Sequence, residues 1–194
     1  DSSTEGQVWY NSTSGTNKTL VQIKAFSAGS NIPTAGNGNA SAVQATQTTA
    51  LSFGLGTAQP QTIEYNGVAW TAGGALGTGR FVLKGAGTQT AALGFGGYID
   101  PGGFTTATEE YDGSSWTAGG ALPSSRSNMG GGGTQTAALS VGGGGPVSPG
   151  NNTEEYNGSS WTAGGAYPVA LQDVCIAGPQ TAALGAGGIS GPPT

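Results

Sequence analysis

The side chains of this chain that could carry acid–base or ionic chemistry are few, and the most conspicuous of them stand in pairs. Two adjacent carboxylates occur at Glu109-Glu110 and again at Glu154-Glu155. Paired carboxylates are the arrangement that glycoside hydrolysis requires. Neighbouring residues of a strand, however, point to opposite faces, so the two members of a pair cannot act on one substrate. We therefore interpret both pairs as structural.

Other catalytic groups are scarce. Histidine is absent, which excludes Ser-His-Asp and Cys-His catalysis and removes the commonest metal ligand. The single cysteine, Cys175, cannot form a disulfide within the chain, and its apolar neighbours predict a small buried side chain. The glycine runs lack the Gly-Lys-Ser/Thr of a phosphate-binding loop. The sequence therefore predicts no enzymatic activity, no metal and no cofactor.

The charge of the chain restricts its partners. Five basic and ten acidic residues give a net charge of −5. Nucleic-acid binding needs clustered Lys and Arg to displace the counterions of phosphates, and no such cluster occurs. The same balance argues against anionic lipid surfaces. No apolar run approaches the roughly 20 residues that span a bilayer. We expect neither a nucleic-acid partner nor membrane insertion.

The elements that hold these side chains are repeats. Three segments share the phrase Glu-Tyr-Asn/Asp-Gly, three further residues and Thr-Ala-Gly-Gly, and their tryptophans, Trp70, Trp116 and Trp161, are 46 and 45 residues apart. A second phrase, Thr-Gln-Thr-Ala-Ala-Leu or a variant with one change, begins 18 residues after each Trp. A degenerate copy precedes them, with Phe26 in place of the first Trp. A fixed period of this size indicates a repeat architecture.

Within each unit the local signals are those of β-strands. The Asn-Gly and Asp-Gly steps predict hairpins with type I′ turns, and two further short strands precede each of them, which gives about four strands per unit. This pattern predicts an all-β fold, a β-propeller of four-stranded blades. We divide the chain into an N-terminal hairpin (1–25), repeat units at 26–72, 73–118 and 119–163, and a last partial unit (164–194).

The number of blades depends on the N-terminal hairpin, which we expect at about Gln7–Asn11 with Leu20–Lys24. If it completes the last blade, the ring closes with four blades within one chain; the alternative is an arc of a larger ring. Large aromatic residues should fill the wide outer space between blades. We expect six of them to act as structural anchors: Tyr65, Trp70, Tyr111, Trp116, Tyr156 and Trp161.

These motifs resemble a known repeat. A Gly pair, a strand with Tyr, a hairpin to Trp and then Leu-Pro-x-x-Arg is similar to the kelch repeat of β-propellers, and Gly96-Gly97, Tyr111, Trp116, Leu122-Pro123 and Arg126 carry it in one unit. The compact phrases Tyr-Asn-Gly-Ser-Ser-Trp-Thr and Gly-Thr-Gln-Thr-Ala-Ala-Leu also resemble repeats in virion proteins of tailed phages. The opening segment 6–12 is similar to one that often precedes such repeats. Departures occur where Leu171 and Gly36 stand at the Arg position.

The resemblance implies a non-enzymatic component of a phage virion, in a fibre, an appendage or a surface decoration. Such a protein is located on the virion, outside the cell. Its partners would be other virion proteins and further copies of itself, and it could attach to a host surface through a glycan. The alternative is a kelch-like carbohydrate-binding lectin domain, with a carbohydrate-active enzyme as the less favoured form of that hypothesis.

Recognition residues are best sought where the repeat is interrupted. The segments 98–106 and 145–152 do not repeat and are therefore free to vary with a ligand. Tyr98 and Phe104 could stack on a sugar ring. Arg80 and Arg126 occupy equivalent repeat positions and could bind the carboxylate of a glycan. For these two arginines, the alternative is a pairing with a Glu of a neighbouring blade or with backbone carbonyls.

Overall fold

Small antiparallel sheets in series form the molecule. The computed structural model describes residues 8–11, 16–19, 30–33, 38–55, 59–145 and 149–190. These residues are all-β apart from one short 3₁₀ turn at Gln180–Ala182, which confirms the all-β part of the predicted fold class. Three of the sheets have four strands and the other three have two.

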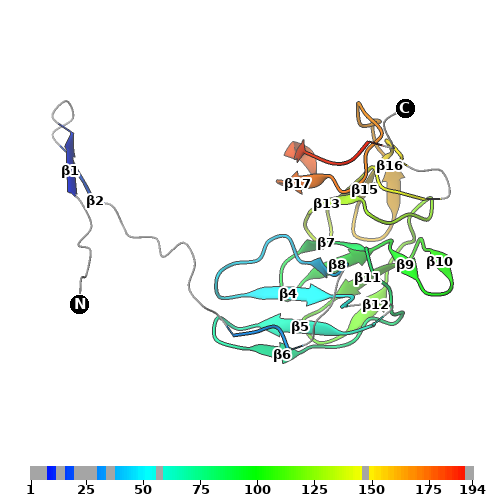
Figure 1. Cartoon of the computed structure of the whole chain (residues 1–194), viewed down its shortest axis with the longest axis horizontal. Helices are drawn as coiled ribbons and strands as arrows, with labels where there is room; N and C mark the ends of the chain where they lie inside the picture. Colours follow the sequence, from blue (N-terminus) through cyan, green and yellow to red (C-terminus); the bar gives the residue numbers. More distant parts are fainter. Residues whose placement is uncertain are drawn as a thin grey trace.

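The four-stranded sheets follow the sequence repeats (Figure 1). The first sheet contains β3 (Ala40–Ser41), β4 (Ala50–Phe53), β5 (Thr62–Tyr65) and β6 (Trp70–Ala72). The second contains β7 (Lys84–Gly87), β8 (Ala92–Phe95), β11 (Thr108–Tyr111) and β12 (Trp116–Ala118). The third contains β13 (Gly130–Gly133), β14 (Ala138–Val141), β15 (Thr153–Tyr156) and β16 (Trp161–Ala163).

The remaining sheets have two strands each. The fourth sheet of the series is only β17 (Cys175–Ala177) with β18 (Leu184–Ala186). A small hairpin of β9 (Tyr98–Ile99) and β10 (Gly103–Phe104) lies between β8 and β11 in the chain. Near the N-terminus, β1 (Val8–Asn11) pairs with β2 (Thr16–Thr19) and with no other strand.

One register is used throughout the series. In each four-stranded sheet the second and third strands are paired in the same way: Leu51 faces Glu64, Leu93 faces Glu110 and Leu139 faces Glu155. Because the side chains of a strand alternate between its faces, a shift by one residue would expose each buried leucine. The repeated sequence therefore imposes the same sheet three times.

The innermost strands of the four sheets, β3, β7, β13 and β17, lie around one cavity of about 220 Å³. A chain of backbone hydrogen bonds links the residues that precede them: Val82 N–H donates to Gly38 (2.6 Å), Asn128 to Val82 (3.1 Å) and Asp173 to Asn128 (2.7 Å). Close packing at this centre requires glycine, because a Cβ at Gly85 would overlap the carbonyl oxygen of Ser41. This crowding accounts for the glycine-rich composition.

Aromatic residues pack between successive sheets, further from the cavity. Phe53 of the first sheet lies against Trp116 of the second, with ring centroids 4.7 Å apart. Phe95 of the second sheet lies in the same way against Trp161 of the third, at 4.9 Å. Both phenylalanines are fully buried. The hydrophobic core is thus a series of junctions between sheets, and the first two junctions each contain one Phe–Trp contact.

The turns of the outer hairpins differ from the prediction. In the connection 112–115 only Gly113 has a positive φ, 93°, whereas a type I′ turn needs two such residues. The Asp112 carboxylate instead accepts hydrogen bonds from the backbone N–H groups of Ser115 and Ser114, each at 2.8 Å, and these bonds lower its pKa to about 2. The type I′ prediction was wrong because the side chain before the glycine closes the turn.

Two further expectations need correction. The partner of β1 is Thr16–Thr19, whereas the expected partner, Leu20–Lys24, lies outside the described residues. Cys175, expected to be buried, is exposed. Its counterpart in the first sheet, Ala40, is 5% exposed. The difference arises because Ala40 packs in a cluster with Leu83 and Ala92 of the second unit, whereas no sheet follows the fourth among the described residues.

Candidate functional site

The arginines and the first glutamate of each pair are used within the scaffold. Arg80 is fully buried and donates to Glu109 Oε1 at 2.5 Å and to the carbonyl oxygen of Gly94 at 3.2 Å. Burial lowers the pKa of Arg80, and the adjacent Glu109 opposes this effect. Arg126 pairs in the same way with Glu154. Each partner belongs to the arginine's own sheet and not to a neighbour, and the burial of both arginines argues against their proposed contact with a glycan carboxylate.

The second glutamate of the repeat joins one sheet to the next. Tyr111 of the second sheet donates its hydroxyl to Glu64 of the first at 2.5 Å, and Tyr156 of the third donates to Glu110 of the second at 2.5 Å. Glu109 and Glu110 thus point to different partners, as strand alternation predicts. Burial, followed by the hydrogen bond to glutamate, raises the pKa of Tyr111 and of Tyr156 to about 12.

These tyrosines predict an alkaline transition. Because their folded pKa lies above the ordinary value of 10.0, their stabilising contribution is fully present below about pH 10 and is lost as the pH rises through about 12. We expect the urea midpoint to fall over that range and tyrosinate absorbance to develop late for two residues. The variant Tyr111→Phe/Tyr156→Phe should lose the late absorbance change; if the wild type shows none, these hydrogen bonds do not persist in solution.

Two other side chains join the sheets in the same repeated manner. The indole N–H of Trp116 donates to Thr62 at 2.9 Å and that of Trp161 to Thr108 at 3.0 Å. A glutamine amide in each later unit donates to two carbonyl groups of the preceding sheet: Gln89 to Ala50 and Tyr65, Gln135 to Ala92 and Tyr111, and Gln180 to Ala138 and Tyr156. The repeated polar residues therefore form junctions between sheets.

The interruption of the repeat at 98–106 creates a different feature, a row of three aromatic rings. Phe81 pairs with Tyr98 through two backbone hydrogen bonds of 3.0 and 2.8 Å, and Tyr98 lies opposite Phe104 in the β9–β10 hairpin. Residues directly opposite in antiparallel strands place their side chains on the same face. The ring centroids are 5.5 Å apart for Phe81 and Tyr98 and 5.3 Å for Tyr98 and Phe104.

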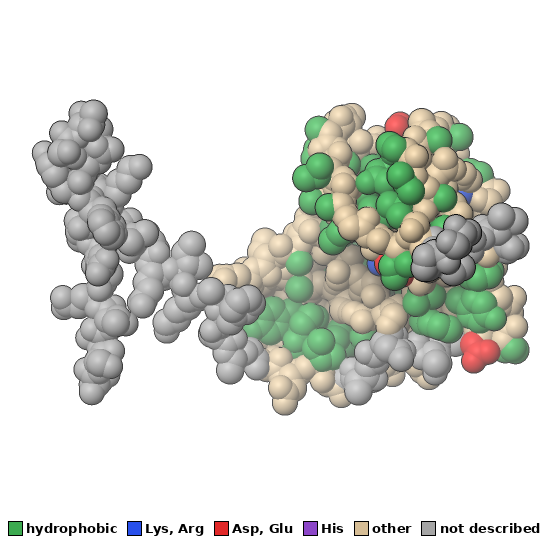
Figure 2. All heavy atoms as spheres, turned by 45° about the horizontal axis from the view of Figure 1, so that its top comes forward, with side chains coloured by type: hydrophobic (Ala, Val, Ile, Leu, Met, Phe, Trp, Pro, Cys, Tyr) green, Lys and Arg blue, Asp and Glu red, His purple; other side chains and the backbone are tan. Residues whose placement is uncertain are grey.

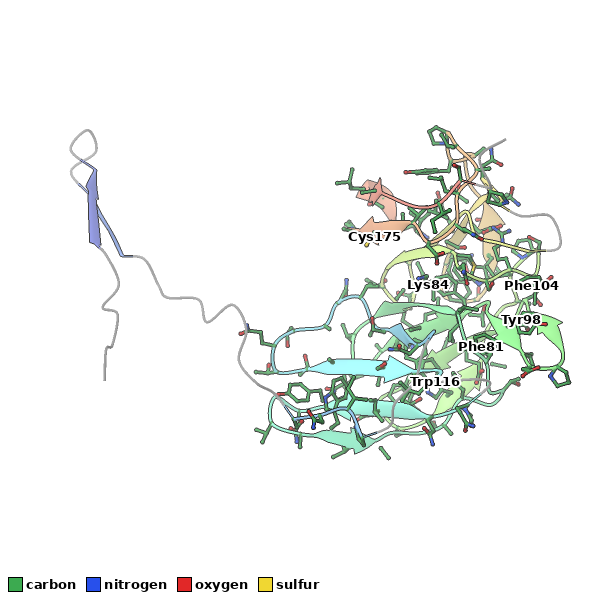
Figure 3. The ribbon with its side chains drawn as sticks, viewed as in Figure 1. Phe81, Lys84, Tyr98, Phe104, Trp116 and Cys175 are labelled. Carbon is green, nitrogen blue, oxygen red and sulfur yellow. The ribbon has the colours of Figure 1, made fainter. Side chains whose placement is uncertain are left out.

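This row lies at the margin of the second sheet, where Figure 3 shows the three labelled rings together. Phe104 is 37% exposed and the other two rings are half-buried. We call Phe81, Tyr98 and Phe104 the aromatic row. Because the row lies beside solvent, a ligand can reach the apolar surface of its rings. Backbone hydrogen bonds between the paired residues hold the rings in place.

Sequence reasoning named Tyr98 and Phe104 but missed Phe81. A signal was present, because Phe81 occupies the position of Ser127 and Gln172 in the following units, each in an isolated bridge of the same kind. An aromatic residue at a position that is polar in the other units is a departure from the repeat, just as an inserted hairpin is. This departure could have identified Phe81.

The second non-repeating segment, 145–152, lies beside an open cavity of about 460 Å³. Residues 146–148 of this segment are outside the described part of the chain. The described wall is polar and includes Ser124, Ser125, Asn151 and Asn152, with the paired Arg126 beneath it. Because Arg126 is already bound by Glu154, the cavity offers hydroxyl and amide groups more readily than a free charge.

Comparison with known proteins gives no assignment: no family model and no curated protein matches this sequence. Within the described ranges, no cluster of three or more His, Cys, Asp or Glu side chains could hold a metal ion. In that same part of the chain, no helix has the length and apolar character needed to cross a membrane.

Proposed function

We propose that the four sheets of the series are blades of a kelch-like β-propeller and that the protein is a non-enzymatic structural and binding component of a phage virion. The observation that carries this proposal is that the repeated and the non-repeated side chains have different roles. Repeated polar side chains are bound in junctions, whereas the aromatic row consists of side chains that the other units lack and is partly exposed. A fibre, an appendage or a surface decoration is the context that the sequence resemblance favours, with other virion proteins and further copies of the chain as partners.

The same row favours host-surface attachment through a carbohydrate. Sugar rings present C–H surfaces that pack on aromatic side chains, and the hydroxyl and amide groups of the neighbouring cavity could fix their orientation. A lectin domain outside a virion is the second candidate, and it rests on the aromatic row alone. Neither candidate requires catalysis by the paired carboxylates.

A glycan array with the full chain tests the binding proposal. We expect selective binding of a carbohydrate, weakened about tenfold or more, or about 1.4 kcal/mol, by Phe104→Ala and by Tyr98→Ala. Val68→Ala is the matched control, because Val68 is 77% exposed and lies in an outer hairpin turn of the first sheet. Equal binding by all variants, or none by the wild type, would contradict the assignment of the row as a binding site.

Imaging of particles from the source organism tests the virion context. Antibody against the full chain should label symmetric positions on a tailed particle. Glycan binding without any labelling of particles would favour the lectin candidate instead.

A further inference from the structure

The fourth sheet of the series exposes a position that is buried in the first two sheets and half-buried in the third. Leu184 of β18 is 71% exposed, whereas Leu51 and Leu93, at the same position in the first and second sheets, are 1% and 0% exposed. Val169 and Ile189 nearby are also about half exposed, and Figure 2 shows hydrophobic side chains gathered over this part of the molecule. The fourth sheet is thus an unfinished unit with an open outer edge.

The face of the third sheet that precedes this gap is prepared for an outer hairpin. A Cβ at Gly74 would overlap the carbonyl oxygen of Ser114 in the next outer turn, and one at Gly120 would overlap that of Ser159. Gly165 occupies the same position in the third unit, yet a Cβ there would meet no described atom within 4 Å. The sequence thus has a glycine at a position where no described neighbour would exclude a larger side chain.

A hydrogen-bond acceptor is also left over on that face. Glu64 and Glu110 each accept the hydroxyl of a tyrosine from the next sheet. Glu155 occupies their position in the third sheet and is exposed. Within the described part of the chain, the sheet that follows it has no third strand from which a tyrosine could come.

The opposite side of the gap is unfinished in the same way. A Cβ at Gly54 would overlap Leu83 of the next unit and one at Gly96 would overlap Met129, whereas one at Gly187 would meet no described atom within 4 Å. In the first sheet, Gln47 stands where Gln89 and Gln135 bind the preceding sheet, and it is exposed. The fourth sheet therefore lacks a successor and the first sheet lacks a predecessor.

The β1–β2 hairpin has the form of the missing element. Its closing pair, Asn11 and Thr16, is separated by four residues, as Tyr111 and Trp116 are in the second sheet. In this alignment Asn11 stands at the position of Tyr111 and Tyr10 at the position of Glu110. Residues 20–39 connect β2 to β3 and can span about 65–70 Å, enough to reach across a domain of this size.

We propose that the β1–β2 hairpin of the same chain docks on the outer edge of β18, completes the fourth sheet and brings it against the first. This inference rests on the propeller arrangement of the proposed function. The shared register places Asn11 opposite Ala183 and Tyr10 opposite Leu184, since Tyr65 and Glu64 face Ala50 and Leu51.

The second strand of the β1–β2 hairpin lacks the tryptophan that the other outer hairpins have, and the third sheet has a corresponding difference. β2 contains no tryptophan to play the part of Trp116 or Trp161. The residue that would face it is Val141, at the position of Phe53 and Phe95. A phenylalanine thus occurs where the next outer hairpin supplies a tryptophan, and a smaller valine occurs where it does not.

Alanine substitution of the three equivalent glycines tests the docking. None of them has a positive φ, so the added Cβ acts only through the space it occupies. We expect Gly74→Ala and Gly120→Ala to lower Tm by about 5–10 °C, from an overpacking cost of about 1–3 kcal/mol. With the hairpin docked, Gly165→Ala lowers Tm by a similar amount; an unchanged Tm overturns the proposal.

A disulfide trap distinguishes docking within a chain from exchange between chains. In a Cys175→Ser background, Asn11→Cys with Ala183→Cys places two thiols at directly opposed strand positions. We expect a disulfide within one chain under mild oxidation, and none when Asn11→Cys is combined with Thr117→Cys, an exposed position on the second sheet. A disulfide between chains, or none in either variant, overturns the proposal. Glycan binding of the same variants reports separately on the proposed function.

Discussion

Replacement of Arg80 by leucine should lower the free energy of unfolding by about 3–5 kcal/mol, because it leaves the largely buried Glu109 carboxylate without its counterion. Glu109 keeps only the backbone N–H of Gly77 as a donor, at 2.6 Å. Removal of one partner from a buried pair is costly since the remaining charge has lost both water and its partner. Urea denaturation at neutral pH, with the slope checked for a change in cooperativity, measures the effect.

The chain contains its own matched control for this experiment. Ile63 occupies the Glu109 position in the first sheet and is 4% exposed, and Leu171 occupies the Arg80 position in the last unit. The double variant Arg80→Leu/Glu109→Ile should therefore recover most of the lost stability, to within about 1–2 kcal/mol of wild type. If the two single losses simply add in the double variant, the residues are not coupled and the ion pair does not form in solution.

The repeat period predicted the sheets correctly because each copy carries the same alternation and the same turn residues. A strand register that buries Leu51 against the next sheet also buries Leu93, since the two surrounding six-residue phrases differ at one residue. Local sequence thus determines local pairing, and the repetition of that sequence gives independent copies of one prediction.

The same reasoning could not assign burial where a neighbour is missing. Cys175 lies in a segment that reads like its buried counterparts, yet it is exposed because, among the described residues, no following sheet covers it as the second unit covers Ala40. Nor could sequence alone tell that Arg80 pairs with Glu109 in its own sheet, because 29 residues separate them and only the folded register brings them together. Such contacts are properties of the assembled sheets.

The candidate site shows the same limit. Tyr98 and Phe104 stand out in a non-repeating segment, so the sequence identified them. Their alignment with Phe81 depends on an isolated bridge between Phe81 and Tyr98 of β9, which no short-range pattern encodes. The row became visible only when the third ring was placed beside the other two.

Substitution of Phe95 by alanine should be the other severe change, with a loss of about 3–5 kcal/mol in the free energy of unfolding. Phe95 is fully buried between the second and third sheets, among Leu122, Met129 and the ring of Trp161. Loss of the ring removes buried apolar surface and leaves a cavity between two sheets whose backbones are fixed by the repeated hydrogen bonds. Thermal and urea unfolding followed by tryptophan fluorescence measure the loss.

The shape of the transition carries as much information as its midpoint. In a repeat protein, stability is approximately a sum of unit terms and of interfaces between neighbours, so a weakened junction between the second and third sheets should separate their unfolding into two steps. Phe104→Ala, at a 37% exposed ring, is the control and should leave one step and a change of at most about 1 kcal/mol. A single unshifted transition for Phe95→Ala would show that the sheets are not held together by the aromatic junction, and the stacked arrangement would have to be abandoned.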